Sequence, residues 1–318
     1  MLARDKIVFV LLAAVVVTVC GCSSTVTPSP APEPMSLYPM TVSDYYDCTV
    51  TIAHAPERIV SLSPVNTEIL FDLGAGGRIV GNTDYCDYPA GAKNITHVSG
   101  FNAISYEKII AICPDLIVAE DIVSEEAIAR LRETGIPLVE LKNNNLSMIR
   151  ENILLIGKIT DTEANATALV AGIDRDVESI RSKTAGLNDS QKPTVLLLAG
   201  LTKKAIYPYG TGTYGDELLT LTGGRNVASG LTGYQVMSNE AIIKADPDFI
   251  VVPVNTPMCT MSAYENLKNG SEPWMKDLKA VRAGKVIAVE GSLFLRPGPR
   301  TPEAGLALAR AIHPELFQ

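Results

Sequence analysis

Two segments of this 318-residue chain repeat one ungapped pattern, Ser-x-Glu-x-Ile-Ile-x-x-x-Pro-Asp followed by a hydrophobic run. The first copy covers residues 105–118 and the second covers residues 238–251. A chain with such an internal repeat is expected to fold as two related halves. Each half then carries one glutamate, Glu107 or Glu240, in the same place.

On two similar lobes, Glu107 and Glu240 would occupy equivalent and roughly symmetric positions. A carboxylate in the first turn of a helix is exposed and can meet a guanidinium group through two hydrogen bonds. The alternative is that each glutamate only complements the dipole of its own helix. Because the glutamate occurs in both copies, we favour docking to a symmetric partner.

Strands alternate with helices along most of the chain, and this order predicts parallel sheets joined by right-handed crossovers. A second echo, Gly-Gly-Arg-x-Val at residues 76–80 and 223–227, supports duplication. We therefore predict an α/β fold with two Rossmann-like lobes, each a parallel-rich sheet with helices, joined by one long rigid helix. Ligands of such sheets bind at the carboxyl ends of strands, so the cleft between the lobes is the expected site.

Composition shifts along the chain predict its domain boundaries. A Ser/Thr/Pro-rich stretch that cannot bury a core follows the amino terminus. The expected divisions are a lipoprotein signal peptide (1–21), a tether (22–45), an N-terminal α/β lobe (46–161), a linking helix (162–188) and a C-terminal α/β lobe (189–318).

The amino terminus has the features of a targeting segment. Arg4 and Lys6 precede an apolar run that is too short for a comfortable membrane span, and Gly21 and Cys22 follow it. This order is typical of a lipoprotein signal peptide with Cys22 as the lipidated residue. Ordinary secretory cleavage or an uncleaved anchor are the alternatives. In each case the protein is exported, and lipidation would hold it at the outer face of the cytoplasmic membrane.

Charge and motif content argue against several functions. The net charge of −8 argues against a nucleic-acid partner. The three histidines are not at metal-ligand spacing, and no nucleophile elbow or phosphate loop occurs, so we assign no catalytic residue, no metal site and no cofactor. We expect Cys113 to be a buried free thiol, and pairing among Cys48, Cys86 and Cys259 stays open.

Five motifs in order resemble one family over roughly residues 55–318. They are residues 58–70, residues 84–89, the two Ser-x-Glu repeats and residues 296–300. The family comprises the class III substrate-binding lipoproteins of ABC importers for cobalamin, ferric siderophores and haem. The resemblance implies a metal chelate as the transported ligand and an ABC permease dimer with its ATPase subunits as partner. It also implies that Glu107 and Glu240 dock against permease arginines.

The resemblance implies a ligand pocket lined by Tyr85, Phe101, Tyr207 and Tyr234, with Arg296 from the final lobe. Aromatic rings offer a flat macrocycle or aryl chelate a large apolar contact, and phenols can bind its polar rim. The alternatives are that the tyrosines are ordinary loop aromatics and that residues 296–300 form a structural turn.

The chain departs from the family pattern at the pocket. Phe101 and Tyr234 stand where cobalamin binders have tryptophan, and the acid Glu120 disfavours strongly anionic catecholate chelates. A corrinoid is the favoured ligand, with a ferric siderophore or haem as the alternative. An exported two-lobe enzyme or a signalling receptor module is less favoured, because no catalytic constellation is present and signalling does not need paired docking glutamates.

Overall fold

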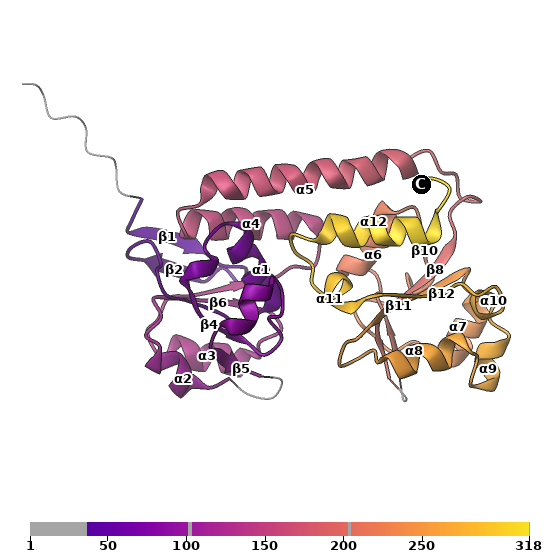
Figure 1. Cartoon of the computed structure of the whole chain (residues 1–318), viewed down its shortest axis with the longest axis horizontal. Coiled ribbons are helices and arrows are strands. Elements are labelled where there is room, and N and C mark those ends of the chain that lie inside the picture. Colours follow the sequence, from indigo (N-terminus) through magenta and orange to yellow (C-terminus); the bar gives the residue numbers. More distant parts are fainter. Residues whose placement is uncertain (1–36, 101–103, 203–204, 318) are drawn as a thin grey trace, which may run out of the picture. The chain divides into compact units, whose positions relative to one another are not determined.

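Each half of the chain forms a parallel β-sheet flanked by helices (Figure 1). The computed structural model describes residues 37–100, 104–202 and 205–317. The N-terminal sheet has the order β5-β4-β3-β6-β7 and is parallel throughout. Its strands are β3 (Ile59–Ser61), β4 (Ile79–Thr83), β5 (His97–Ser99), β6 (Leu116–Glu120) and β7 (Leu138–Leu141).

The C-terminal sheet has the order β10-β8-β11-β12, and these four strands are parallel. An additional strand, β9, pairs antiparallel with β8. The strands are β8 (Thr194–Leu201), β9 (Ile206–Pro208), β10 (Arg225–Asn226), β11 (Phe249–Val254) and β12 (Val286–Glu290). The predicted α/β fold with parallel-rich sheets is confirmed.

The two sheets match strand by strand. In the N-terminal lobe β6 lies between β3 and β7, and in the C-terminal lobe β11 lies between β8 and β12. The Gly-Gly-Arg-x-Val echo lies at the start of β4 and at β10, which pair with β3 and β8 on their other edges. Four strands therefore correspond in order, which supports the predicted duplication.

The repeated segments also end their helices alike. Helix α2 (Tyr106–Ala111) precedes β6, and helix α7 (Asn239–Ala245) precedes β11. Just beyond each helix the chain turns through the left-handed region, at Cys113 (φ 45°) and at Asp246 (φ 37°). Cys113 is exposed, so the expectation of a buried thiol is wrong. The left-handed turn before Pro114 directs this residue away from the core.

The aspartate of each repeat anchors its strand to a neighbouring strand. Asp115 accepts hydrogen bonds from the backbone N–H groups of Glu57 and Arg58 at 2.9 and 3.0 Å, just before β3. Asp248 accepts one from the backbone N–H of Thr194 at 2.8 Å, at the start of β8. In each lobe, the repeat's aspartate therefore accepts hydrogen bonds from the backbone at the start of the neighbouring strand.

Helices cover both faces of each sheet. In the N-terminal lobe these are α1 (Pro64–Asp72), α2, α3 (Glu125–Arg132) and α4 (Leu146–Ile159), with 3₁₀ turns η1 (Gly76–Arg78) and η2 (Ala90–Asn94). In the C-terminal lobe they are α6 (Tyr214–Leu221), α7, α8 (Met261–Lys268), α9 (Pro273–Lys276), α10 (Lys279–Arg282), α11 (Gly291–Phe294) and α12 (Thr301–Ile312).

A hairpin precedes the first lobe. It consists of β1 (Met40–Ser43) and β2 (Thr49–Ile52), which pair antiparallel. Strand β1 lies inside the range 22–45 that we assigned to the tether. Its alternating Met40 and Val42 are buried, so the folded part begins earlier than composition indicated.

Helix α5 (Glu163–Thr184) links the two halves and lies within the range 162–188 expected for the linking helix. It packs against α4 of the N-terminal lobe and against α6 and α12 of the C-terminal lobe. One hydrophobic core beneath it includes Ile153 of α4, Ile173 of α5 and Leu308 of α12. Residues 38–318 accordingly form a single compact unit.

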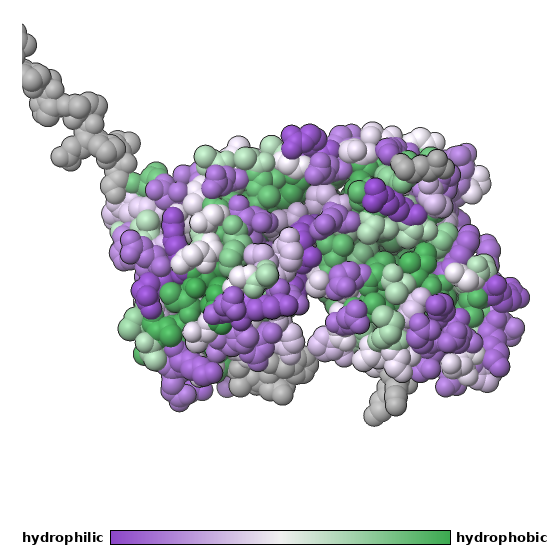
Figure 2. Space-filling view, in the orientation of Figure 1, coloured by the Kyte–Doolittle hydropathy of each residue, from purple (hydrophilic) through white to green (hydrophobic). Residues whose placement is uncertain are grey.

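Within the described part of the chain, no helix has both the length and the apolar character needed to cross a membrane. The face seen in Figure 2 is a mosaic of hydrophilic and hydrophobic residues. All four cysteines in the described ranges are free, so Cys48, Cys86 and Cys259 form no disulfide with one another. Cys22 lies outside the described residues.

Candidate functional site

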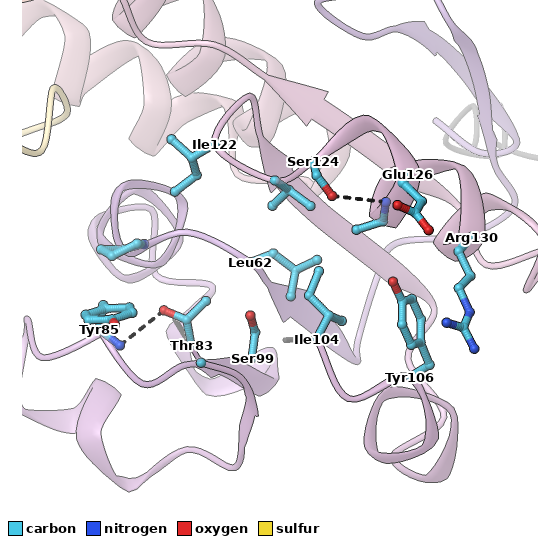
Figure 3. Close-up of a pocket in the computed structure, with 14 residues that line it drawn as sticks. Leu62, Thr83, Tyr85, Ser99, Ile104, Tyr106, Ile122, Ser124, Glu126 and Arg130 are labelled. Atoms are coloured by element: carbon cyan, nitrogen blue, oxygen red, sulfur yellow. Dashed lines mark hydrogen bonds between the residues drawn. The ribbon is translucent and has the colours of Figure 1, made fainter. Parts of the chain in front are cut away.

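The N-terminal lobe has a cavity of about 710 Å³ at the carboxyl ends of its strands (Figure 3). Loops that follow β3, β4, β5 and β6 form its walls, together with the start of α3. This edge is where open α/β sheets bind ligands, and the volume suits a small molecule. The lining includes Leu62, Thr83, Ser99, Ile104, Tyr106 and Ile122.

Tyr85, predicted to contact the ligand, lies on the wall of this cavity with 37% of its surface exposed (Figure 3). Its backbone N–H donates to the hydroxyl of Thr83 at 3.3 Å. Its carbonyl oxygen accepts a hydrogen bond from the Nη2 of Arg296 at 2.9 Å. The loop that carries Tyr85 is therefore fixed both by its own strand and by the other lobe. Phe101 lies outside the described residues.

Arg296 was also predicted to contact the ligand. In the described part of the chain, its guanidinium contacts other protein groups. Its Nη1 lies 2.6 Å from Asp87 and 3.3 Å from Glu68, and 13% of its side chain is exposed. All these partners belong to the N-terminal lobe. The guanidinium thus holds the Tyr85 loop in place, and contact with a ligand stays a prediction.

Glu68 is the centre of the contacts between the lobes, and sequence reasoning missed it. Its carboxylate is buried and accepts two hydrogen bonds from Arg300, at 2.9 and 2.7 Å. The guanidinium of Arg300 also lies 4.1 Å from the ring centroid of Tyr88. The sequence did contain a signal for this cluster. Glu68 interrupts a largely apolar helix, and Arg296 and Arg300 lie close to one another in the sequence of the C-terminal lobe.

Tyr234 lies on the C-terminal lobe beside a second tyrosine. Its ring meets that of the buried Tyr209 edge-on, with centroids 5.5 Å apart. Tyr209 in turn donates from its hydroxyl to the carbonyl of Phe294 at 3.0 Å. Although 50% of its surface is exposed, partial desolvation of the hydroxyl, together with the charges of Asp121 and Glu120, raises the pKa of Tyr234 to about 12. The phenol therefore stays protonated, and the two acids that act on it lie at the end of β6 in the other lobe.

Tyr207 lies apart from the other predicted residues. It belongs to β9 and is half-buried. Its ring and the side chain of Met258 cover Gly200, where an added Cβ would lie 3.3 Å from each. Tyr207 does not line the cavity of the N-terminal lobe. The structure therefore brings Arg296 to Tyr85, places Tyr234 near the end of β6, and leaves Tyr207 separate.

Glu120, expected to influence ligand charge, has its carboxylate inside the protein. The hydroxyl of Ser63 and the amide of Asn143 both donate to it, the latter at 3.0 Å. Burial raises the pKa of Glu120, and these two hydrogen bonds oppose the shift. Because the carboxylate is satisfied internally and does not line the cavity, the expected exclusion of anionic chelates loses its basis.

The cavity has a cationic edge that sequence reasoning also missed. The guanidinium of Arg130 in α3 lies 4.3 Å from the ring centroid of Tyr106 in α2. Both residues line the cavity, and Figure 3 shows them side by side with Glu126. Arg130 and Tyr106 belong to separate helices and are brought together by the fold. Their spacing in the sequence does not predict this contact.

Glu107 and Glu240 are both exposed and both lie in the first turn of their helices, as predicted. Hydrogen bonds from its own backbone N–H and from the Ser238 hydroxyl lower the pKa of Glu240. Ser238 caps α7 by accepting from the backbone N–H of Ala241 at 3.2 Å. The two carboxylates are thus available to a partner on the surface of each lobe.

Among the described residues, no group of three or more His, Cys, Asp and Glu side chains could hold a metal ion. The polar and aromatic groups around the cavity are suited to binding an organic ligand.

The sequence of this chain is similar to that of known proteins. Residues 59–293 match the family model described as "Periplasmic binding protein". An uncharacterised ABC transporter substrate-binding lipoprotein of Bacillus subtilis, YvrC, is 32% identical over 89% of this chain and 88% of its own length. A cobalamin-binding protein of Halobacterium salinarum is 27% identical, over 87% of this chain and 74% of its own.

Solved structures agree with the sequence comparison. The periplasmic haem-binding protein RhuT from Roseiflexus superposes with a TM-score of 0.73 at 26% identity, covering 82% of this chain and 99% of its own. Substrate-binding lipoproteins and periplasmic proteins function outside the cytoplasm, which agrees with the predicted export. The chain therefore belongs to the periplasmic binding protein family, whose members are solute-binding transport proteins rather than enzymes.

Proposed function

We propose that this protein is the extracytoplasmic substrate-binding protein of an ABC importer, with a corrinoid such as cobalamin as the favoured ligand. The observation that carries the proposal is the 710 Å³ cavity with Tyr85 on its wall, at the edge of the sheet where ligands bind. A cobalamin-binding protein among the relatives supports the choice of a corrinoid.

The walls of the cavity suit a large, flat chelate. Tyr85 and Tyr106 offer aromatic faces, and Leu62 and Ile122 add apolar contact. The hydroxyl groups of Thr83 and Ser99 are within the lining and can bind amide or carboxylate groups at the rim of a ligand. Tyr234, which is influenced by the charges of Glu120 and Asp121 at the end of β6, would close the site from the C-terminal lobe.

Haem or a ferric siderophore is the second candidate. The superposition on a haem-binding protein favours haem. Arg130 at the edge of the cavity adds a specific reason, because a guanidinium can bind the carboxylates of an anionic ligand through two hydrogen bonds.

The partner would be the permease dimer with its ATPase subunits. Glu107 and Glu240 occupy equivalent exposed positions on the two lobes, and a two-fold permease can present one arginine to each. Lipid on Cys22 would keep the protein at the outer face of the cytoplasmic membrane, within reach of the permease.

Ligand binding can be tested on the mature domain. We would incubate it with cyanocobalamin, a ferric hydroxamate and haem, desalt each sample and record absorbance spectra. We expect cyanocobalamin to be retained. Retention of haem or the hydroxamate alone would select the second candidate, and retention of none would overturn the chelate-receptor proposal.

A matched pair of variants locates the site. Tyr85→Ala should weaken binding roughly tenfold or more, as for a buried aromatic contact. Tyr46→Ala changes a tyrosine that lies in the β1–β2 connection outside the cavity and should bind as the parent does. Equal losses in both variants would argue against the cavity as the site.

Docking can be tested separately. Charge reversal at both glutamates, Glu107→Arg with Glu240→Arg, should abolish transport and leave ligand retention unchanged. Reversal of the exposed Glu178, which lies on α5, serves as the control. Loss of ligand retention in the double variant would contradict the assignment of these residues to docking.

A further inference from the structure

The two isoleucines of each repeat have opposite environments. Ile109 and Ile242 are buried, with 0% and 1% of their surface exposed. Ile110 and Ile243, the next residues, expose 54% and 46%. Because the same split occurs in both lobes, it follows the repeat rather than an accident of local packing.

Each exposed isoleucine shares a helix face with a glutamate. Ile110 follows Glu107 by three positions in α2, and Ile243 follows Glu240 by three positions in α7. Residues at this spacing are neighbours on a helix surface. Each lobe therefore presents a carboxylate beside a large apolar side chain.

The other outward positions of the two helices differ from one another. Lys108 in α2 corresponds to Ala241 in α7, and Ala111 corresponds to Lys244, and all four are exposed. A single exposed apolar residue needs no explanation. An exposed isoleucine kept in both copies, where neighbouring surface positions have diverged, requires a common cause acting on both lobes.

Both helices lie on the sheet faces directed away from α5 (Figure 1). Ile109 and Ile242 pack into the cores on those faces, whereas α5 belongs to the core on the opposite faces. The acid and isoleucine pairs thus occupy corresponding places in the two lobes. A partner with two-fold symmetry can offer the same complementary surface to each pair.

We propose that Ile110 and Ile243 form the apolar half of the docking surface, with one isoleucine contacting each subunit of the permease dimer. This inference rests on the proposed docking of Glu107 and Glu240. Burial of the isoleucine removes water from beside the carboxylate, and exclusion of water strengthens a pairing with a permease arginine. The apolar contact adds affinity that salt does not screen.

The test measures affinity for the permease–ATPase complex of the importer, reconstituted in lipid nanodiscs, at low and high salt. Ile110→Ser with Ile243→Ser should weaken binding about tenfold, as expected when two half-exposed isoleucines lose their burial. The dependence of affinity on salt should persist. Leu154→Ser, at a leucine in α4 that is 42% exposed, is the matched control and should bind as the parent does.

The charge variants separate this inference from the docking proposal. Glu107→Gln with Glu240→Gln should weaken binding and flatten its salt dependence. If the glutamine variant weakens binding while the serine variant equals the Leu154→Ser control, the isoleucine inference is wrong and docking stands. If neither double variant changes affinity, the docking proposal itself fails.

Discussion

The carboxylate of Glu68 in α1 accepts two hydrogen bonds from the guanidinium of Arg300, which belongs to the C-terminal lobe. Only 1% of the Glu68 side chain and 14% of the Arg300 side chain are exposed. Arg296 adds a third contact to the same carboxylate. The lobes are therefore joined on this side by a largely dehydrated cluster of charges.

Removal of the buried charge should be strongly destabilising. Glu68→Gln leaves the guanidinium of Arg300 without its carboxylate and Arg296 with Asp87 alone, and we expect the free energy of unfolding to fall by about 3–5 kcal/mol. The exposed pair of Glu178 and Arg181 provides a control, since Glu178→Gln should cost less than about 1 kcal/mol. Urea unfolding measures both, and similar losses in the two variants would contradict the role given to Glu68.

Two glycines in the α4–α5 pair should respond oppositely to alanine. A Cβ at Gly157 would lie 2.4 Å from the Cβ of Ala166, so Gly157→Ala must push the helices apart and should cost about 1–3 kcal/mol. At Gly172 the nearest atom would lie 3.7 Å away. Gly172→Ala should therefore stabilise by up to about 1 kcal/mol through helix propensity. Thermal unfolding distinguishes them, and stabilisation by both would exclude a close helix contact.

Asp248 should make the free energy of unfolding depend on pH in the acid range. Burial alone would raise its pKa, but hydrogen bonds from Lys279 and Thr194 outweigh burial and lower the pKa to about 2. An unfolded aspartate titrates near ~3.9. Its stabilising contribution is thus complete above a pH of about 4 and is lost as the pH falls toward about 2.

The test compares Asp248→Asn with the parent at several pH values. At pH 7 the variant should unfold at lower urea concentration, and the difference should shrink as the pH falls below about 4. Asp189→Asn, at an aspartate 92% exposed, should show no such trend. A deficit that stays constant down to acid pH would show that the charge of Asp248 is not responsible.

Glu120 should affect the pH dependence of stability in the opposite direction to Asp248. Burial raises its pKa, so the ionised form costs stability above the unfolded value of about 4.3, and this cost disappears as the pH falls through that value. Glu120→Gln should consequently gain stability relative to the parent at pH 7.5 compared with pH 4. Urea midpoints at the two pH values measure this, with the exposed Glu126→Gln as control. A relative loss at pH 7.5 would contradict it.

Sequence patterns predicted most of the scaffold for physical reasons. The strands β6 and β11 are apolar runs that follow Pro-Asp, and α5 is a long stretch with few helix breakers. Short elements carry a weaker signal: in the three-residue strand β5 only Val98 is buried, and helices α9 and α10 have four residues each. Four-residue helices are too short to show a helical period.

The site was less predictable because its contacts cross between distant segments. Tyr85 could be named from a motif, and the exposed glutamates from the repeat. The pairing of Glu68 with Arg300 joins the first helix to the last loop, and Arg130 meets Tyr106 from a neighbouring helix. Such pairs depend on tertiary packing that no local pattern encodes.

The shared core beneath α5 is completed by Leu308 and Ile312 of α12, the last helix of the chain. Because α5 and α12 are far apart in the sequence, the apolar faces of α5 and α6 stay open until most of the C-terminal lobe has become ordered. Chains with such unfinished cores remain accessible to chaperones. Late closure would therefore leave the apolar faces of α5 and α6 as the surface that a chaperone can hold while the chain folds.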